Sequence, residues 1–139
     1  NTNAGAVDYF LEDFTTCPDL GPAIAVACGG LNITADLTGL KNFTIKESDR
    51  AAALQRGLYD LSVKTDFCGG SKFKVYSASG PRKTGRILKC YNDHRMAMAF
   101  SMMALQVGEV LLDDFSCVKK SYPGFRADLE RAGFSVEDI

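Results

Sequence analysis

The sequence contains one pattern twice, and this repeat constrains the fold more than any other feature of the chain. The first copy contains CPDLGPAIAVAC and the second contains YNDHRMAMAFSM, which align so that Asp19 falls on Asp93. The same shift along the chain places Lys46 on Lys120. Self-similarity of this kind indicates a supersecondary unit that is used more than once. The sequence therefore predicts two related structural units.

Each copy has the same predicted order of elements. An aspartate suited to capping a helix precedes a run of small and apolar residues, and a strand, a lysine-bearing turn and a second helix follow. The predicted helices begin at Asp19 and Asp93 and then cover 47–61 and 123–133. The predicted strands cover 31–37, 61–66, 72–77, 85–90, 109–115 and 134–138, with a Gly-Pro loop at 77–86. These elements predict an α/β (α+β) fold whose helices pack on small mixed sheets, in two related units, 1–80 and 81–139.

Composition excludes several classes of protein. The 139 residues carry a formal net charge of -1, so a general nucleic-acid surface, which needs a basic excess, is disfavoured. Five widely spaced cysteines and a single histidine, His94, argue against a disulfide framework and against a metal site. No apolar run approaches the roughly 20 residues that span a bilayer. We expect a cytoplasmic protein without a metal site. Because the chain starts abruptly at Asn1, we also expect it to be a truncated piece.

Basic side chains stand at the predicted starts of helices, where the helix dipole disfavours them. Arg95 follows Asp93 by two residues, Lys46 and Arg50 flank the start of the second helix, and Lys119 and Lys120 precede the fourth. Each placement costs about 0.3–1 kcal/mol when exposed. A single case is explained by a solvated surface side chain. The set as a whole favours a bound anion such as a phosphate, held by helix N-termini and basic side chains.

Carboxylates accompany these cations, and each has two interpretations. Glu47 either forms a local ion pair with Arg50 or serves as a proton-transfer group in a cationic pocket. Asp19 and Asp93 are most simply helix N-caps. The single His94 is more often a hydrogen-bonded structural residue than a catalyst.

Four segments together resemble the 5-enolpyruvylshikimate-3-phosphate synthase family. They are PDLGPAIAV (18–26), IKESDR (45–50), NDHRMAMAFS (92–101) and CVKKSYPGF (117–125). The resemblance covers nearly the whole chain but only the C-terminal third of such an enzyme. It implies a two-domain enolpyruvyl transferase built from repeated βαβαββ units, whose N-terminal domain is absent here. It also implies transfer of the enolpyruvyl group of phosphoenolpyruvate to the 5-hydroxyl of shikimate 3-phosphate, with release of phosphate and no cofactor or metal.

The resemblance implies a catalytic pair and ligands for one substrate. Asp19 resembles the aspartate that contacts the shikimate hydroxyls and accepts a proton. Glu47 resembles the group that protonates the enol carbon. Asn42 and Lys46 resemble ligands of shikimate 3-phosphate.

The resemblance implies a second set of residues, which bind phosphoenolpyruvate. Arg50, Arg95 and Lys120 resemble the three side chains that bind phosphoenolpyruvate. Asp93 and His94 lie in the same motif as Arg95 and are expected to support it. An arginine fork suits such an oxyanion, because it can form two parallel hydrogen bonds.

Two alternatives remain beside this hypothesis. One is the enolpyruvyl transferase that acts on UDP-N-acetylglucosamine, which should lack the KESDR and NDHRMAM pair. The other is a non-catalytic module that binds a phosphorylated ligand, which retention of both Asp19 and Glu47 disfavours. The expected partners are the two small substrates and the missing N-terminal domain, with no nucleic acid and no membrane. The isolated chain should be inactive, and segment 66–84 carries no motif with an assigned function.

Overall fold

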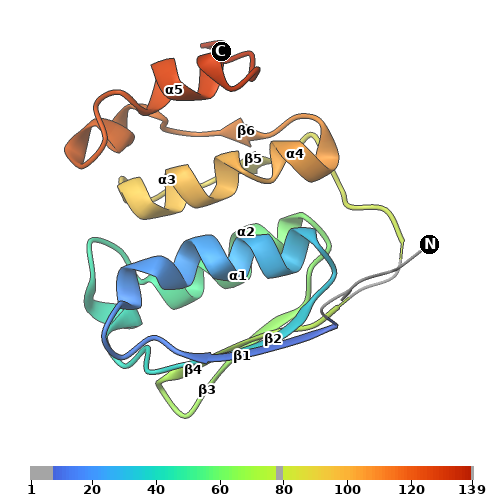
Figure 1. Cartoon of the computed structure of the whole chain (residues 1–139), viewed down its shortest axis with the longest axis vertical. Helices are drawn as coiled ribbons and strands as arrows, with labels where there is room; N and C mark the ends of the chain where they lie inside the picture. The colour runs from blue at the N-terminus through green and yellow to red at the C-terminus, as the bar shows by residue number, and fades with distance from the viewer. Residues whose placement is uncertain (1–7, 78–79, 139) are drawn as a thin grey trace.

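The computed structural model describes residues 8–77 and 80–138, and these fold into stacked layers of sheet and helix (Figure 1). A four-stranded sheet forms one outer layer, and α1 and α2 cover one of its faces. The next layer holds α3 and α4, with a two-stranded sheet and α5 beyond it. The strands are β1 Tyr9–Asp13, β2 Thr34–Thr38, β3 Thr65–Cys68, β4 Lys72–Val75, β5 Ile87–Leu88 and β6 Leu111–Leu112. The α-helices are α1 Gly21–Gly30, α2 Arg50–Asp60, α3 His94–Ser101, α4 Ala104–Val107 and α5 Phe125–Arg131.

The larger sheet has the strand order β1-β2-β4-β3. β1 and β2 are parallel and joined through α1, whereas β4 runs antiparallel to both of its neighbours. In β4 the sequence alternates, so Phe73 and Val75 are buried against the helices while Lys72 and Lys74 are not. This alternation with a period of two is what a sheet with one covered face requires.

The helix layers meet at small residues. α1, GPAIAVACGG, is apolar on every side, as expected for a helix that lies between a sheet and another helix. Gly57 of α2 lies against the ring of Phe100 in α3, and a Cβ built on Gly57 would come within 2.3 Å of Phe100 Cζ. The close approach of α2 to α3 therefore depends on glycine at this position.

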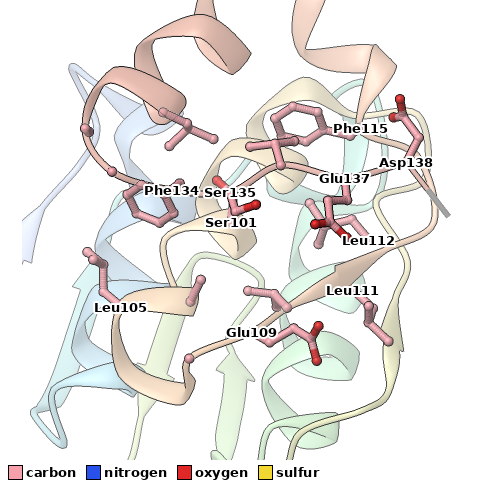
Figure 2. Close-up of a pocket in the computed structure, with 17 residues that line it drawn as sticks. Ser101, Leu105, Glu109, Leu111, Leu112, Phe115, Phe134, Ser135, Glu137 and Asp138 are labelled. Carbon is pink, nitrogen blue, oxygen red and sulfur yellow. The ribbon is translucent and has the colours of Figure 1, made fainter.

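The second sheet is smaller, and a hollow opens beside it. β5 and β6 pair in parallel over two residues each. A hollow of about 530 Å³ lies between α4, β6 and residues 132–138. Figure 2 shows Leu105, Phe115 and Phe134 on its walls. The hollow lies at the C-terminal end of α3, where Ser101 faces it. Among the described residues, none of the helices is long and apolar enough to span a bilayer.

Most predicted elements are present, but several differ in extent, and the strands predicted at 85–90 and 109–115 shrink to two residues each. The prediction of a strand at 134–138 is wrong, because these residues form no strand. Instead, Nη2 of Arg126 donates a hydrogen bond to the carbonyl oxygen of Val136 at 2.9 Å. The strand predicted at 61–66 begins only at Thr65. β1 was not predicted at all. Residues 78 and 79 of the predicted loop lie outside the described residues.

Candidate active site

The predicted site residues lie where three helical segments begin or end on one side of the molecule. Asp19 is in the short 3-10 helix η1 (Pro18–Leu20), which leads into α1. Glu47 and Arg50 stand at the start of α2, and Asp93 stands at the start of α3. We call these four residues the carboxylate–arginine cluster. They come from three separate segments of the chain, so the fold is what brings them together.

Arg50 is the centre of the cluster and is almost completely buried, with 1% of its surface exposed. Its Nε donates to Asp93 Oδ2 at 2.9 Å and its Nη1 donates to Asp19 Oδ1 at 2.8 Å. Its Nη2 donates to Glu47 Oε2 at 2.7 Å and to Asp93 Oδ1 at 3.3 Å. Burial disfavours the charge, but the hydrogen bonds to Asp93 and Asp19 outweigh this effect, so the pKa of the guanidinium is raised.

Asp93 is fully buried and caps α3, as the sequence predicted. Its Oδ1 accepts from the backbone N–H of Arg95 at 2.9 Å, and its Oδ2 accepts from Ser48 Oγ at 2.8 Å. Burial alone would raise the pKa of this carboxyl, but the hydrogen bonds from Arg50 and Ser48 reverse the effect and lower it. One carboxylate therefore caps a helix and neutralises a buried arginine.

Asp19 does not cap a helix, so the N-cap interpretation of this residue was wrong. Pro18 begins a 3-10 turn that places Asp19 inside η1, and α1 starts after Leu20 without a side-chain cap among the described residues. The carboxylate faces three cations instead. It lies 2.8 Å from Arg50 Nη1, 3.7 Å from Lys46 Nζ and 3.8 Å from Arg95 Nη2. Partial burial opposes ionisation, but these cations, led by the Arg50 hydrogen bond, lower the pKa of Asp19.

Arg95 and Lys120 complete the basic border of the cluster. The side chain of Arg95 is 35% exposed, and its Nε is enclosed without a hydrogen-bond partner among the described residues. Lys120 ends the 3-10 helix η3 (Ser116–Lys120), and its Nζ donates to the carbonyl oxygen of Asn92 at 2.5 Å. Asn92 directly precedes Asp93. Arg95 thus joins the cluster through Asp19, and Lys120 binds the backbone of the residue directly before Asp93.

The remaining predicted residues differ in how closely they join the cluster. Lys46 reaches Asp19, whereas Glu47 bonds to Arg50 and keeps 46% of its side chain exposed. Asn42 is exposed before η2 (Phe43–Ile45), and its side chain makes no hydrogen bond to the described part of the chain that would place it in the cluster. His94 is buried, and its Nδ1 finds no partner in residues 8–77 and 80–138.

Sequence reasoning missed two contributors. Ser48 donates to Asp93, and the backbone of Asn92, with φ of 55°, offers its carbonyl to Lys120. Both lie inside the motifs quoted above, but neither residue type by itself signals such a role. The hollow of Figure 2 is a separate feature at the other end of α3 and holds none of the predicted site residues. The described residues contain no group of three or more His, Cys, Asp or Glu side chains that could hold a metal ion.

The cluster and its neighbouring cations thus bring together groups that can bind a small anion and carboxylates that can exchange a proton. The sequence model of the EPSP synthase (3-phosphoshikimate 1-carboxyvinyltransferase) family matches residues 3–129. The chain belongs to the EPSP synthase family.

Individual relatives agree with this family. The chain is 37% identical to a 3-phosphoshikimate 1-carboxyvinyltransferase of Bacteroides fragilis, over 97% of this chain and 33% of the relative. It is 35% identical to the enzyme of that name from Aeropyrum pernix, over 99% of this chain and 31% of the relative. Among solved structures, EPSP synthase from Acinetobacter baumannii superposes with a TM-score of 0.72 at 25% identity, over 86% of this chain and 28% of that one. The chain thus spans about a third of the length of these relatives, and its α/β fold is that of the family.

Proposed function

We propose that this chain is the C-terminal part of a transferase that moves the enolpyruvyl group of phosphoenolpyruvate to the 5-hydroxyl of shikimate 3-phosphate and releases phosphate. Such a reaction belongs to the shikimate pathway of aromatic amino acid biosynthesis. Family membership supports the reaction class. The observation that carries the proposal is the meeting of Arg50, Arg95 and Lys46 at one carboxylate, that of Asp19.

The cations bind the substrates in this proposal. Arg50, Arg95 and Lys120 hold the carboxylate and phosphate of phosphoenolpyruvate, while Lys46 and Asn42 hold shikimate 3-phosphate. The carboxylates that now occupy the outer N–H groups of Arg50 belong to Asp19 and Glu47, both about half-exposed. A dianion entering the site competes with them for these donors. Fixed cations also stabilise the departing phosphate, which gains charge as its bond breaks.

Asp19 and Glu47 are the proposed acid–base pair. Asp19 accepts the proton of the 5-hydroxyl as that oxygen bonds to the central enol carbon, and Glu47 donates a proton to the terminal carbon. In the second step the terminal carbon returns a proton to Glu47 while the bond to phosphate breaks, which restores the double bond, and the departing phosphate takes the proton that Asp19 had accepted. Both carboxylates contact the same guanidinium, so the site holds them near each other before substrate arrives.

The partners and location follow from the same proposal. The substrates are two small phosphorylated metabolites, and the rest of the enzyme supplies a second domain that faces this one. We propose a cytoplasmic enzyme, which the lack of a membrane-spanning helix in the described residues supports. Because the chain spans about a third of its relatives, the isolated chain should show no measurable turnover.

A hybrid enzyme tests the proposal. The part of the Bacteroides fragilis relative that matches this chain is replaced by the chain, and phosphate release is measured with phosphoenolpyruvate and shikimate 3-phosphate. Glu47→Gln should lower kcat by about 10²- to 10⁴-fold, the usual contribution of general acid–base catalysis. Glu109→Gln, at an exposed position in the hollow of Figure 2, is the matched control and should leave the rate unchanged.

Each alternative has its own result. Phosphate release with UDP-N-acetylglucosamine in place of shikimate 3-phosphate would favour the sugar-nucleotide enzyme. A Glu47→Gln hybrid as fast as the unsubstituted one would favour a module that only binds a phosphorylated ligand.

A further inference from the structure

We infer that Ser48 is a positioning residue that orients the guanidinium of Arg50 through the carboxylate of Asp93. Ser48 is half-buried in the loop before α2, and its Oγ lies 2.8 Å from Asp93 Oδ2. It touches neither Asp19 nor Glu47 through any hydrogen bond in the described part of the chain. The inference rests on the proposed function, since Arg50 there binds the anionic substrate.

The guanidinium of Arg50 has an inner and an outer edge. The inner edge, Nε together with Nη2, faces the two oxygens of Asp93. The outer N–H groups of Nη1 and Nη2 face Asp19 and Glu47. Rotation of the carboxylate of Asp93 would therefore turn the whole planar fork and move the outer donors away from the position that the substrate must occupy.

Each carboxylate oxygen of Asp93 accepts two hydrogen bonds, and Oδ2 reaches two only because Ser48 donates one of them. Oδ1 accepts from the Arg95 backbone N–H and from Arg50 Nη2, and Oδ2 accepts from Arg50 Nε and from Ser48 Oγ. Because Asp93 is fully buried, water does not replace a missing donor freely. Without the hydroxyl, Oδ2 keeps only the hydrogen bond from Arg50 Nε, so on that side the carboxylate has no donor that is independent of the guanidinium it orients.

Ser48 itself is held in place by its neighbour. Asp49 caps α2, with its Oδ1 accepting from the Ala52 N–H at 3.0 Å. This cap fixes the backbone immediately after Ser48, so the hydroxyl is presented to Asp93 from a rigid helix start. Ser48 thereby ties the start of α2 to the start of α3, which carries Arg95.

The kinetic test compares Ser48→Ala and Ser48→Thr in the hybrid enzyme described above. Ser48→Ala should raise KM for phosphoenolpyruvate by about ten-fold, with a smaller fall in kcat, because a misaligned Arg50 binds the dianion less well. Ser48→Thr keeps the hydroxyl and should stay within about two-fold of the unsubstituted hybrid. Ser101→Ala removes a buried hydroxyl that bonds to the Met98 carbonyl, outside the cluster, and should leave KM unchanged.

A double-mutant cycle separates positioning from general stabilisation. Arg50→Lys removes Nε, so in that background Ser48→Ala should change kcat/KM by less than about two-fold. Equal KM values for all Ser48 variants, equal impairment of Ser48→Ala and Ser48→Thr, or a full Ser48→Ala effect in the Arg50→Lys background would each overturn the inference.

A second measurement does not depend on turnover. In NMR spectra of this chain, Ser48→Ala should shift the Arg50 Nε–H and Arg95 amide resonances, and Ser48→Thr should not. Unchanged resonances in Ser48→Ala would overturn the inference even in an active hybrid. A hybrid that fails to turn over while these shifts appear would instead count against the proposed reaction.

Discussion

Asp19 and Asp93 occupy equivalent places in the repeated sequence pattern, yet the fold gives them different roles. Asp93 directly precedes α3, is fully buried and caps that helix. Asp19 lies one 3-10 turn before α1, caps nothing among the described residues and keeps 48% of its side chain exposed. Both carboxylates bind Arg50. The comparison indicates that equivalent sequence positions can bind the same arginine from a fully buried site in one region and from a half-exposed site in the other.

The two regions of the chain that carry these aspartates also differ in the size of their sheets. The region before residue 78 has a four-stranded sheet under α1 and α2, whereas the region after residue 79 has two short strands and an open hollow. The four-stranded region contributes Asp19, Lys46, Glu47 and Arg50, and the other contributes Asp93, Arg95 and Lys120. The division into two related units, 1–80 and 81–139, stays a prediction.

The largest expected effect is a difference in folding stability between substitutions of the two aspartates. Asp93→Asn removes the buried partner of Arg50 and should lower the free energy of unfolding by about 3–5 kcal/mol, as expected when a buried pair is broken. Asp19→Asn breaks a half-exposed contact and should cost at most about 1 kcal/mol. Urea unfolding followed by circular dichroism measures both, and equal losses would show that the aspartates are not distinguished as described.

A second prediction concerns the contact between the two regions. Gly57→Ala places a Cβ against the Phe100 ring and should destabilise the chain by about 1–3 kcal/mol, the usual cost of overpacking. Gly124→Ala is the matched control, since the nearest atom to its added Cβ lies at 3.8 Å. Thermal unfolding compares the two, and a neutral Gly57→Ala would contradict the close approach of α2 and α3.

A third prediction contrasts helix caps. Asp49→Ala removes the cap of α2 and should cost about 1 kcal/mol. The corresponding removal at Asp19 should produce no loss of helix protection at the start of α1, because Asp19 does not cap it. Amide hydrogen exchange at Ala52 and at the first residues of α1 measures both, and faster exchange in α1 after Asp19→Ala would restore the cap interpretation.

The smallest effect is on pH dependence. The pKa of Asp19 is below its unfolded value of 3.8, so its contribution is present above pH 3.8 and is lost as the pH falls through the lower folded value. Because the group is half-exposed, this contribution is at most about 1 kcal/mol. Between pH 5 and pH 3 the stability of Asp19→Asn should therefore fall less steeply than that of the unsubstituted chain. If stability falls in parallel with pH in both proteins, the three cations do not lower the pKa of Asp19.

Sequence reasoning found the cluster but not its internal arrangement. Cations at helix starts are visible in the sequence, because their placement opposes the helix dipole, and Arg50 and Arg95 were found in this way. Asp93 was found as a candidate helix cap. The resemblance to the family then linked segments that are far apart in the chain. The burial of Arg50 could not be predicted, because it depends on Asp19 and Asp93 arriving from two other segments.

The failures have local causes. Asp19 resembles an N-cap in sequence, but Pro18 fits a preceding 3-10 turn that displaces the helix start. The strand expected at 134–138 has an alternating pattern, yet Arg126 binds its backbone instead of a neighbouring strand. Ser48 was missed because its hydroxyl meets a carboxylate that is distant in sequence.

An NMR titration of this chain with phosphoenolpyruvate at low ionic strength tests most directly whether cations from separate segments form one anion site. The account predicts that resonances at the starts of α2 and α3 and at Lys120 shift together, along a single saturable curve, and that Arg95→Gln weakens all of them. Shifts centred instead on other basic surfaces, such as Arg56, Lys64 and Lys83, with the carboxylate–arginine cluster unchanged, would contradict it.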